Sequence, residues 1–157
     1  MKLQNKNIVI TGAADGIGYA LANRIQRENP KSLSLIDIND SVERVARSLR
    51  ADSYVVDVSN ENNFQSVLKK IIDKNDSVDL FCSNAGIQQF GTLETSTEDW
   101  QKNWDVNVMS HVYASKVLIP HMKRQKSGYI LLTVSAAGLL NMPGALAYAT
   151  VSYTHLT

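Results

Sequence analysis

Thr11-Gly12-Ala13-Ala14-Asp15-Gly16-Ile17-Gly18 directly follows the apolar run Ile8–Ile10 and directly precedes a helical pattern from Ala20 to Ile25. The three glycines of this stretch let a backbone turn tightly and approach a pyrophosphate, whose charge then lies at the positive N-terminus of the helix. A glycine cluster alone also fits an ordinary strand-to-helix turn. Because a short buried strand precedes this cluster and a helix follows it, the context favours a phosphate-binding loop.

The rest of the chain alternates between strand and helix patterns. Apolar stripes indicate helices, and the first stripe is formed by Ile17, Ala20, Leu21 and Ile25, in a helix that Pro30 ends. Two capping boxes, Asp40 with Glu43 and Thr95 with Glu98, indicate where two further helices begin. The predicted strands cover 7–11, 33–38, 53–56, 78–82 and 129–134, and the predicted helices cover 17–25, 42–49, 64–71 and 96–125. This alternation predicts right-handed crossovers and a doubly wound parallel sheet, a three-layer αβα Rossmann fold.

Asp37 stands near the end of the second predicted strand, about 20 residues beyond the glycine loop, which is the spacing of the acidic residue that binds ribose hydroxyls in dinucleotide-binding folds. The alternative is a solvated turn residue beside Asn39 and Asp40.

Together these motifs resemble the short-chain dehydrogenase/reductase family. The loop matches the T-G-x-x-x-G-x-G of that family, and Asn84-Ala85-Gly86 matches the N-A-G that ends its fourth strand. Further matches follow in order along residues 5–150: Asp57 and Val58 with the adenine-contacting D-V pair, Asn107 with the mid-helix asparagine, and Ser135 and Tyr148 with the catalytic serine and tyrosine. The resemblance implies an oxidoreductase that transfers a hydride between NAD(P) and an alcohol or ketone.

The resemblance also assigns roles to residues. Tyr148 is the implied acid/base, Ser135 hydrogen-bonds the reacting oxygen, and Asn107 supports an ordered water. The implied cofactor-binding residues are Thr11, Gly12, Gly16, Ile17, Gly18, Asp37, Asp57, Val58, Asn84, Ala85 and Gly86. NAD is expected over NADP, because Asp37 would accept both ribose hydroxyls of NAD and repel a 2′-phosphate.

Position 152 departs from the family's Y-x-x-x-K, in which the lysine helps the tyrosine lose its proton. Here it is Ser152, and no Lys or Arg follows Lys126. Tyrosine ordinarily has a pKa of about 10, and a serine hydroxyl supplies no positive charge that would lower it. We therefore expect this chain to be inactive as it stands. The alternative is a non-catalytic dinucleotide-binding or regulatory protein; a sugar-nucleotide epimerase of the related extended kind is disfavoured by the glycine spacing and the N-A-G.

The end of the chain is a second departure, because a doubly wound sheet should continue beyond a fifth strand. We expect residues 1–150 to form one dinucleotide-binding domain that lacks its last strand or strands. Residues 151–157 are β-branched and polar, and the hypothesis is that they are a non-native tail. By the resemblance, the parent protein forms a homodimer or homotetramer through the long helix 96–125 and the Tyr148 helix.

Composition excludes several classes of function. With 44% hydrophobic and 20% charged residues and a net charge of +1, the chain reads as one globular domain without a general affinity for nucleic acid. A single cysteine, Cys82, and the lack of a signal-peptide or membrane-span pattern predict a cytoplasmic protein that does not bind membranes.

His111 and His121 lie too far apart for a helical metal pair, so no metal is expected. Trp100 and Trp104 share a predicted stripe with Val108 and Val112, which makes them candidate core residues. The substrate, beyond a small alcohol or carbonyl compound, is not identified by the sequence.

Overall fold

A five-stranded parallel sheet forms the centre of the computed structural model, which describes residues 2–140 and 143–154. The strand order is β3-β2-β1-β4-β5, and every neighbouring pair is parallel. The strands are β1 (Asn7–Thr11), β2 (Ser32–Asp37), β3 (Asp52–Val55), β4 (Leu80–Ser83) and β5 (Tyr129–Leu132). The predicted fold class is confirmed. The order reverses between β1 and β4, and ligands of such sheets bind at that point, beyond the carboxyl ends of the strands.

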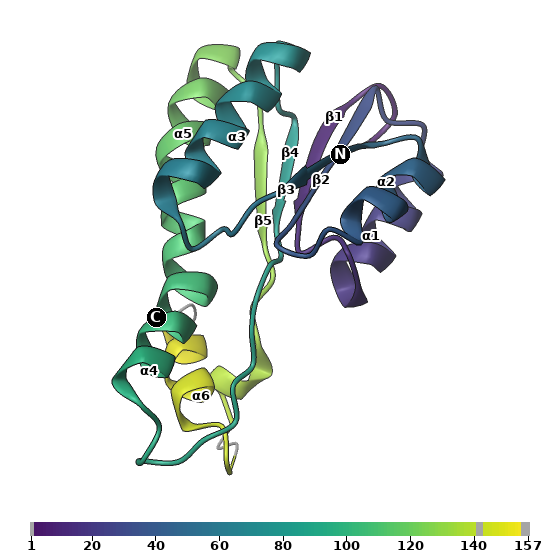
Figure 1. The fold of residues 1–157 in the computed structure, drawn as a ribbon. Helices are drawn as coiled ribbons and strands as arrows, with labels where there is room; N and C mark the ends of the chain where they lie inside the picture. Colours follow the sequence, from purple (N-terminus) through teal and green to yellow (C-terminus); the bar gives the residue numbers. More distant parts are fainter. Residues whose placement is uncertain (1, 141–142, 155–157) are drawn as a thin grey trace.

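Helices cover both faces of the sheet (Figure 1). On one face lie α1 (Gly16–Gln26) and α2 (Val42–Leu49); on the other lie α3 (Glu61–Asn75) and α5 (Ser110–Gln125). Two shorter helices, α4 (Thr97–Trp104) and α6 (Leu146–Tyr153), lie beyond the carboxyl ends of the strands. Alternate residues of β1 enter separate cores: Ile8 and Ile10 pack toward α1 and α2, and Val9 packs toward α3 and α5. A strand buried on both faces explains why Ile8–Ile10 is a continuous apolar run.

Both predicted capping boxes are wrong. The helix α2 begins after Ser41 rather than Asp40, and the Ser41 side chain forms no cap hydrogen bond. Instead, the Asn39 side-chain oxygen accepts the Ser41 N–H at 2.9 Å, in a turn that leads from β2 into the helix.

At α4 the cap lies one residue beyond the predicted Thr95. Ser96 Oγ accepts the Asp99 N–H at 3.1 Å, whereas the Thr95 hydroxyl donates to the Thr92 carbonyl at 2.7 Å. Both residues are good caps in general, and the turn at Thr92 decides which one is used.

The buried face of α1 also differs from the predicted stripe. Ile17 is 63% exposed and Ala20 is exposed, while the buried residues are Gly18, Ala22 and Ile25. The close approach of Gly18 to the backbone of Gly12 turns this face of the helix toward the sheet.

The long helix predicted over 96–125 is interrupted by a π-helical turn, η1 (Asp105–Met109), between α4 and α5. Trp104 and Val112 are 38% and 39% exposed, so their assignment to the core is wrong, and Trp100 and Val108 are only partly buried. The buried residues of α4 and η1 are instead Asn103, Val106 and Asn107, two of which are polar. The π-helical turn shifts the register of the helix. The chain segment that packs on Asn103 and Asn107 presents polar groups, and buried polar groups require polar partners.

The C-terminal segment is helical through Tyr153, and Val151 and Ser152 are buried in α6. The residues at 155–157 of the predicted tail lie outside the part of the chain that the structure describes. Strand β5 lies at one edge of the sheet, and Tyr129, Leu131 and Leu132 on it are 59%, 48% and 42% exposed. Within the described ranges, no helix has the length and apolar character needed to cross a membrane.

Candidate functional site

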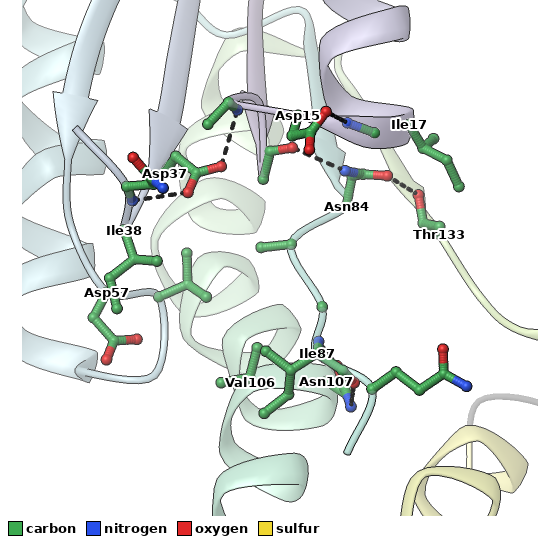
Figure 2. A pocket seen from close by; sticks show the side chains of 18 of the residues that line it. Asp15, Ile17, Asp37, Ile38, Asp57, Asn84, Ile87, Val106, Asn107 and Thr133 are labelled. Carbon is green, nitrogen blue, oxygen red and sulfur yellow. Dashed lines mark hydrogen bonds between the residues drawn. The ribbon is translucent and has the colours of Figure 1, made fainter. Parts of the chain in front are cut away.

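A cavity of about 930 Å³ opens at the carboxyl ends of the strands, where the strand order reverses. Its lining combines residues that follow each of the five strands, and Figure 2 shows part of it. All of the predicted site residues except Thr11 and Gly18 line this cavity: Gly12, Gly16, Ile17, Asp37, Asp57, Val58, Asn84, Ala85, Gly86, Asn107, Ser135 and Tyr148. Residues far apart in the sequence therefore meet at one cavity.

The glycine loop leaves no room for side chains on its inner surface. A Cβ on Gly12 would lie 2.8 Å from the Cα of Ala85, and Gly12 has φ of +66°, a conformation that favours glycine. A Cβ on Gly18 would overlap the carbonyl oxygen of Gly12. Asp15 caps α1, because its carboxylate accepts the Gly16 N–H at 2.7 Å. The loop thus brings bare backbone and a helix N-terminus to the wall of the cavity, which fits a pyrophosphate.

Asp37 lies at the end of β2 with its carboxylate held by two backbone amides. It accepts the N–H of Ala14 and that of Asn39, each at 2.9 Å. Figure 2 shows it between the glycine loop and Ile38, on the side of the cavity where Asp57 also lies. The Asp57 carboxylate is fixed in turn by the Ser59 N–H at 2.9 Å and the Ser59 hydroxyl at 2.7 Å.

Thr11 and Asn84 join the strands behind the cavity. The Thr11 hydroxyl oxygen accepts the N–H of Asn84 at 2.9 Å and that of Ala85 at 3.0 Å. The Asn84 amide donates to the Thr11 carbonyl at 3.1 Å and accepts from the Thr133 hydroxyl at 3.0 Å, so it connects β1 to the end of β5 (Figure 2). Thr133 was not predicted, because no motif signals its position.

Ser135 and Tyr148 line the same cavity from the η2 turn (Ala136–Gly138) and from α6. The Ser135 oxygen accepts the Ala137 N–H at 3.1 Å, which leaves the hydroxyl hydrogen able to donate into the cavity. Ser152 is 3% exposed, lines the cavity, and donates its hydroxyl to the Tyr148 carbonyl at 2.7 Å. The residue at the family's lysine position therefore faces the site but carries no charge.

Asn107 holds the backbone of Ile87 with both ends of its side-chain amide. Its oxygen accepts the Ile87 N–H at 2.9 Å and its nitrogen donates to the Ile87 carbonyl at 2.9 Å (Figure 2). This two-bond clamp fixes the segment that follows Asn84-Ala85-Gly86 against the π-helical turn.

A buried polar pair in the wall of the cavity was missed by the sequence reasoning. Ser83 Oγ and His111 Nδ1 share a hydrogen bond of 2.6 Å, and His111 is 8% exposed and lines the cavity. Its position one helical turn after Asn107, on the same face, is the signal that could have identified it. Nearby on β4, burial raises the pKa of the Cys82 thiol to about 11, so this cysteine stays protonated at neutral pH.

Comparison with known proteins agrees with this geometry. The family model for short chain dehydrogenases matches residues 6–151. The chain belongs to the short-chain dehydrogenase family. It is 34% identical to the meso-2,3-butanediol dehydrogenase of Serratia marcescens over 152 residues, which are 94% of this chain and 60% of that protein.

Solved structures of short-chain dehydrogenases share the fold closely. A short-chain dehydrogenase/reductase from Burkholderia phymatum in complex with NAD superposes with a TM-score of 0.92 at 31% identity, covering 99% of this chain and 58% of that one. NAD⁺-bound xylitol dehydrogenase gives a TM-score of 0.92 at 27% identity, covering 99% and 63%. The chain thus spans about three fifths of the length of these relatives.

Proposed function

We propose that the cavity binds NAD and that the chain supplies the cofactor site of an oxidoreductase acting on an alcohol or carbonyl compound. The observation that carries the proposal is the single cavity in which the glycine loop, Asp37, Ser135 and Tyr148 meet. NAD, once bound, supplies the hydride acceptor. The family and the NAD-bound relatives support a nicotinamide dinucleotide at this site.

The chain's own residues divide the cavity into two ends. At the adenosine end, Asp57 and Val58 would contact the adenine and Asp37 would accept the ribose hydroxyls. The glycine loop would hold the pyrophosphate at the N-terminus of α1. At the other end, Asn84, Ala85 and Gly86 would line the nicotinamide side.

Ser135 and Tyr148 carry the proposed chemistry. The free hydroxyl hydrogen of Ser135 would donate to the reacting oxygen and hold it in place, while the side-chain oxygen of Tyr148 would take the proton of the alcohol. Asn107 would act by fixing the segment around Ile87.

The uncharged Ser152 favours the second candidate, a protein that binds the dinucleotide without turning it over. Among the described residues that line the cavity, the Arg and Lys side chains are those of Arg44 and Lys102, which belong to α2 and α4 rather than to the Tyr148 helix. We infer that the unsubstituted chain is catalytically inactive or nearly so.

The test is the rate of NADH formation or consumption with a panel of secondary alcohols and ketones. We expect no turnover above background, and we expect Ser152→Lys alone to change this little. The reason is that a lysine at position 152 acts only if its ammonium is held close to Tyr148, and turnover also requires a pocket that encloses the substrate. Turnover of the unsubstituted chain at a rate typical of enzymes, about 1 s⁻¹ or more, would contradict the inactive state.

Assembly and location are further proposals. Trp104, Val112 and Ile119 are exposed along α4 and α5, and an apolar stripe of this kind suits pairing with a second copy, as a homodimer or homotetramer. Sedimentation equilibrium of the unsubstituted chain and of Val112→Glu tests this.

A cytoplasmic location is supported by one free, buried thiol, and fractionation of expressing cells tests it.

A further inference from the structure

The segment joining β4 to α4 is held at alternate residues by three different elements. Ile87 is clamped to η1 by Asn107, as described above. Gln89 is bonded to side chains of α4, and Gly91 is bonded to the start of α6. The segment therefore lies between the helix that carries Asn107 and the helix that carries Tyr148.

The middle anchor is an amide pair formed by the partly buried Gln89 and the buried Asn103. The Asn103 side chain is fully buried, and its nitrogen donates to Gln89 Oε1 at 2.7 Å and to the Asp99 carbonyl at 3.0 Å. Its oxygen accepts from Asn107 Nδ2 at 3.4 Å. Gln89 Nε2 donates to Asp99 Oδ1 at 2.8 Å. Both donor hydrogens of the Asn103 amide thus have acceptors, and a satisfied buried network of this kind is rigid.

Gly91 continues this path to the Tyr148 helix. Its N–H donates to the Gly144 carbonyl at 2.6 Å, and its carbonyl accepts the N–H of Leu146 at 3.3 Å. Leu146 is the first residue of α6, and Tyr148 lies in the same turn. A shift of the segment at Gln89 therefore reaches both the Asn107 clamp and the start of α6.

A leucine at position 103 would bury more apolar surface and would need no partner. An amide pair instead fixes one register between the segment and α4, because its hydrogen bonds are directional. We propose that Gln89 and Asn103 are positioning residues that set the spacing between the nicotinamide side of the cavity, at 84–87, and the helix of Tyr148. This inference rests on the proposed function of the cavity.

The two ends of the cavity should respond differently when the pair is broken. The adenosine end is held by Asp37 and Asp57, whose hydrogen bonds do not involve the segment after β4. ADP-ribose carries the adenosine and pyrophosphate but no nicotinamide. Loosening the segment should therefore weaken NADH binding and leave ADP-ribose binding nearly unchanged.

The experiment measures the dissociation constants of NADH and ADP-ribose by calorimetry for matched variants. Gln89→Leu should weaken NADH binding by roughly fivefold or more and change ADP-ribose binding by less than about twofold. Gln101→Ala, which removes an exposed amide of α4 bonded to Asp105, is the control and should change neither. The double variant Gln89→Glu with Asp99→Asn reverses one donor and acceptor and should recover NADH binding to within about twofold.

If folded Gln89→Leu keeps the same ratio of NADH to ADP-ribose affinity as the unsubstituted chain, whether both affinities are unchanged or both fall equally, the inference is overturned. If the unsubstituted chain binds neither ligand, the proposed function fails. Hydrogen exchange then decides the positioning role by itself. Faster exchange of the Ile87 and Leu146 amides in Gln89→Leu supports it, and unchanged exchange overturns it.

Discussion

At the residue scale, Asp15 both caps a helix and places a negative charge where a pyrophosphate would lie. Its carboxylate accepts the Gly16 N–H at 2.7 Å on the wall of the cavity, and this amide is one that a phosphate could use. An asparagine caps a helix as well as an aspartate does but carries no charge. Asp15 is therefore expected to weaken dinucleotide binding.

Replacing Asp15 tests this directly. Asp15→Asn should tighten NADH binding by roughly fivefold, since one exposed charge at a few ångströms contributes about 1 kcal/mol. The gain should shrink at high salt, because salt screens exposed charges. Fluorescence titration with NADH at low and high salt measures both effects. Equal or weaker binding by Asp15→Asn at low salt would show that the carboxylate does not oppose the cofactor.

Asp37 is predicted to set the choice between NAD and NADP. Its carboxylate is pinned by the Ala14 and Asn39 amides, so it cannot swing away from a 2′-phosphate. Asp37→Ala should narrow the affinity gap between NAD and NADP by roughly tenfold. Asp37→Asn, which keeps an acceptor oxygen, separates loss of charge from loss of the loop contacts. Tighter binding of NADP than of NAD by the unsubstituted chain would refute the predicted preference.

Much of the candidate site could be predicted from residues in motifs, because the fold brings the ends of successive strands together. Gly12, Asp37, Ser135 and Tyr148 meet for this reason. Contacts such as Ser83 with His111 and Gln89 with Asn103 join positions that no motif relates, so the sequence alone gave no means of pairing them.

At the element scale, the strands were predictable because each is short, and β1 and β4 are in addition buried along their whole length. Helix starts were not, since Ser96 and Thr95 are equally plausible caps and a tertiary turn chooses between them. The buried face of 97–125 was misread for a related reason. A π-helical turn changes the period on which every stripe argument depends.

The start of β1 depends on one partly buried carboxylate. Asp79 accepts the Asn7 N–H at 2.8 Å and the Lys6 ammonium at 2.9 Å, with a side chain that is 13% exposed. Asp79→Ala leaves the backbone N–H of the buried Asn7 without its acceptor. The variant should lose about 2 kcal/mol of unfolding free energy.

The exposed ion pair of Asp52 with Lys74 is the matched control. Its partners are 2.7 Å apart, but their side chains are 34% and 55% exposed. Although the hydrogen bond that the Lys74 ammonium donates to Asp52 raises the pKa of Lys74, Asp52→Ala should lose less than about 1 kcal/mol of unfolding free energy, because exposed pairs contribute little. Urea unfolding of both variants measures the difference. Equal losses would mean that burial does not govern the strength of these contacts.

At the scale of the whole molecule, the cavity lies where the sheet order reverses between β1 and β4, and there the glycine loop after β1 lies against Ala85 after β4. The adenosine end rests on β2 and the loop after β3, and the opposite end rests on β4, β5 and α6. Binding of a dinucleotide thus requires the complete arrangement of layers rather than any single motif.

The central claim is that this cavity binds NAD through the bare backbone at Gly12. The most direct measurement is calorimetric titration of NADH into the unsubstituted chain and into Gly12→Val, with circular dichroism to show that both are folded. A side chain at Gly12 would meet the Ala85 backbone and a strained φ, so it should close the loop to the pyrophosphate. We predict saturable one-to-one binding by the unsubstituted chain and at least roughly tenfold weaker binding by folded Gly12→Val. No binding by the unsubstituted chain, or equal binding by both, would contradict the account.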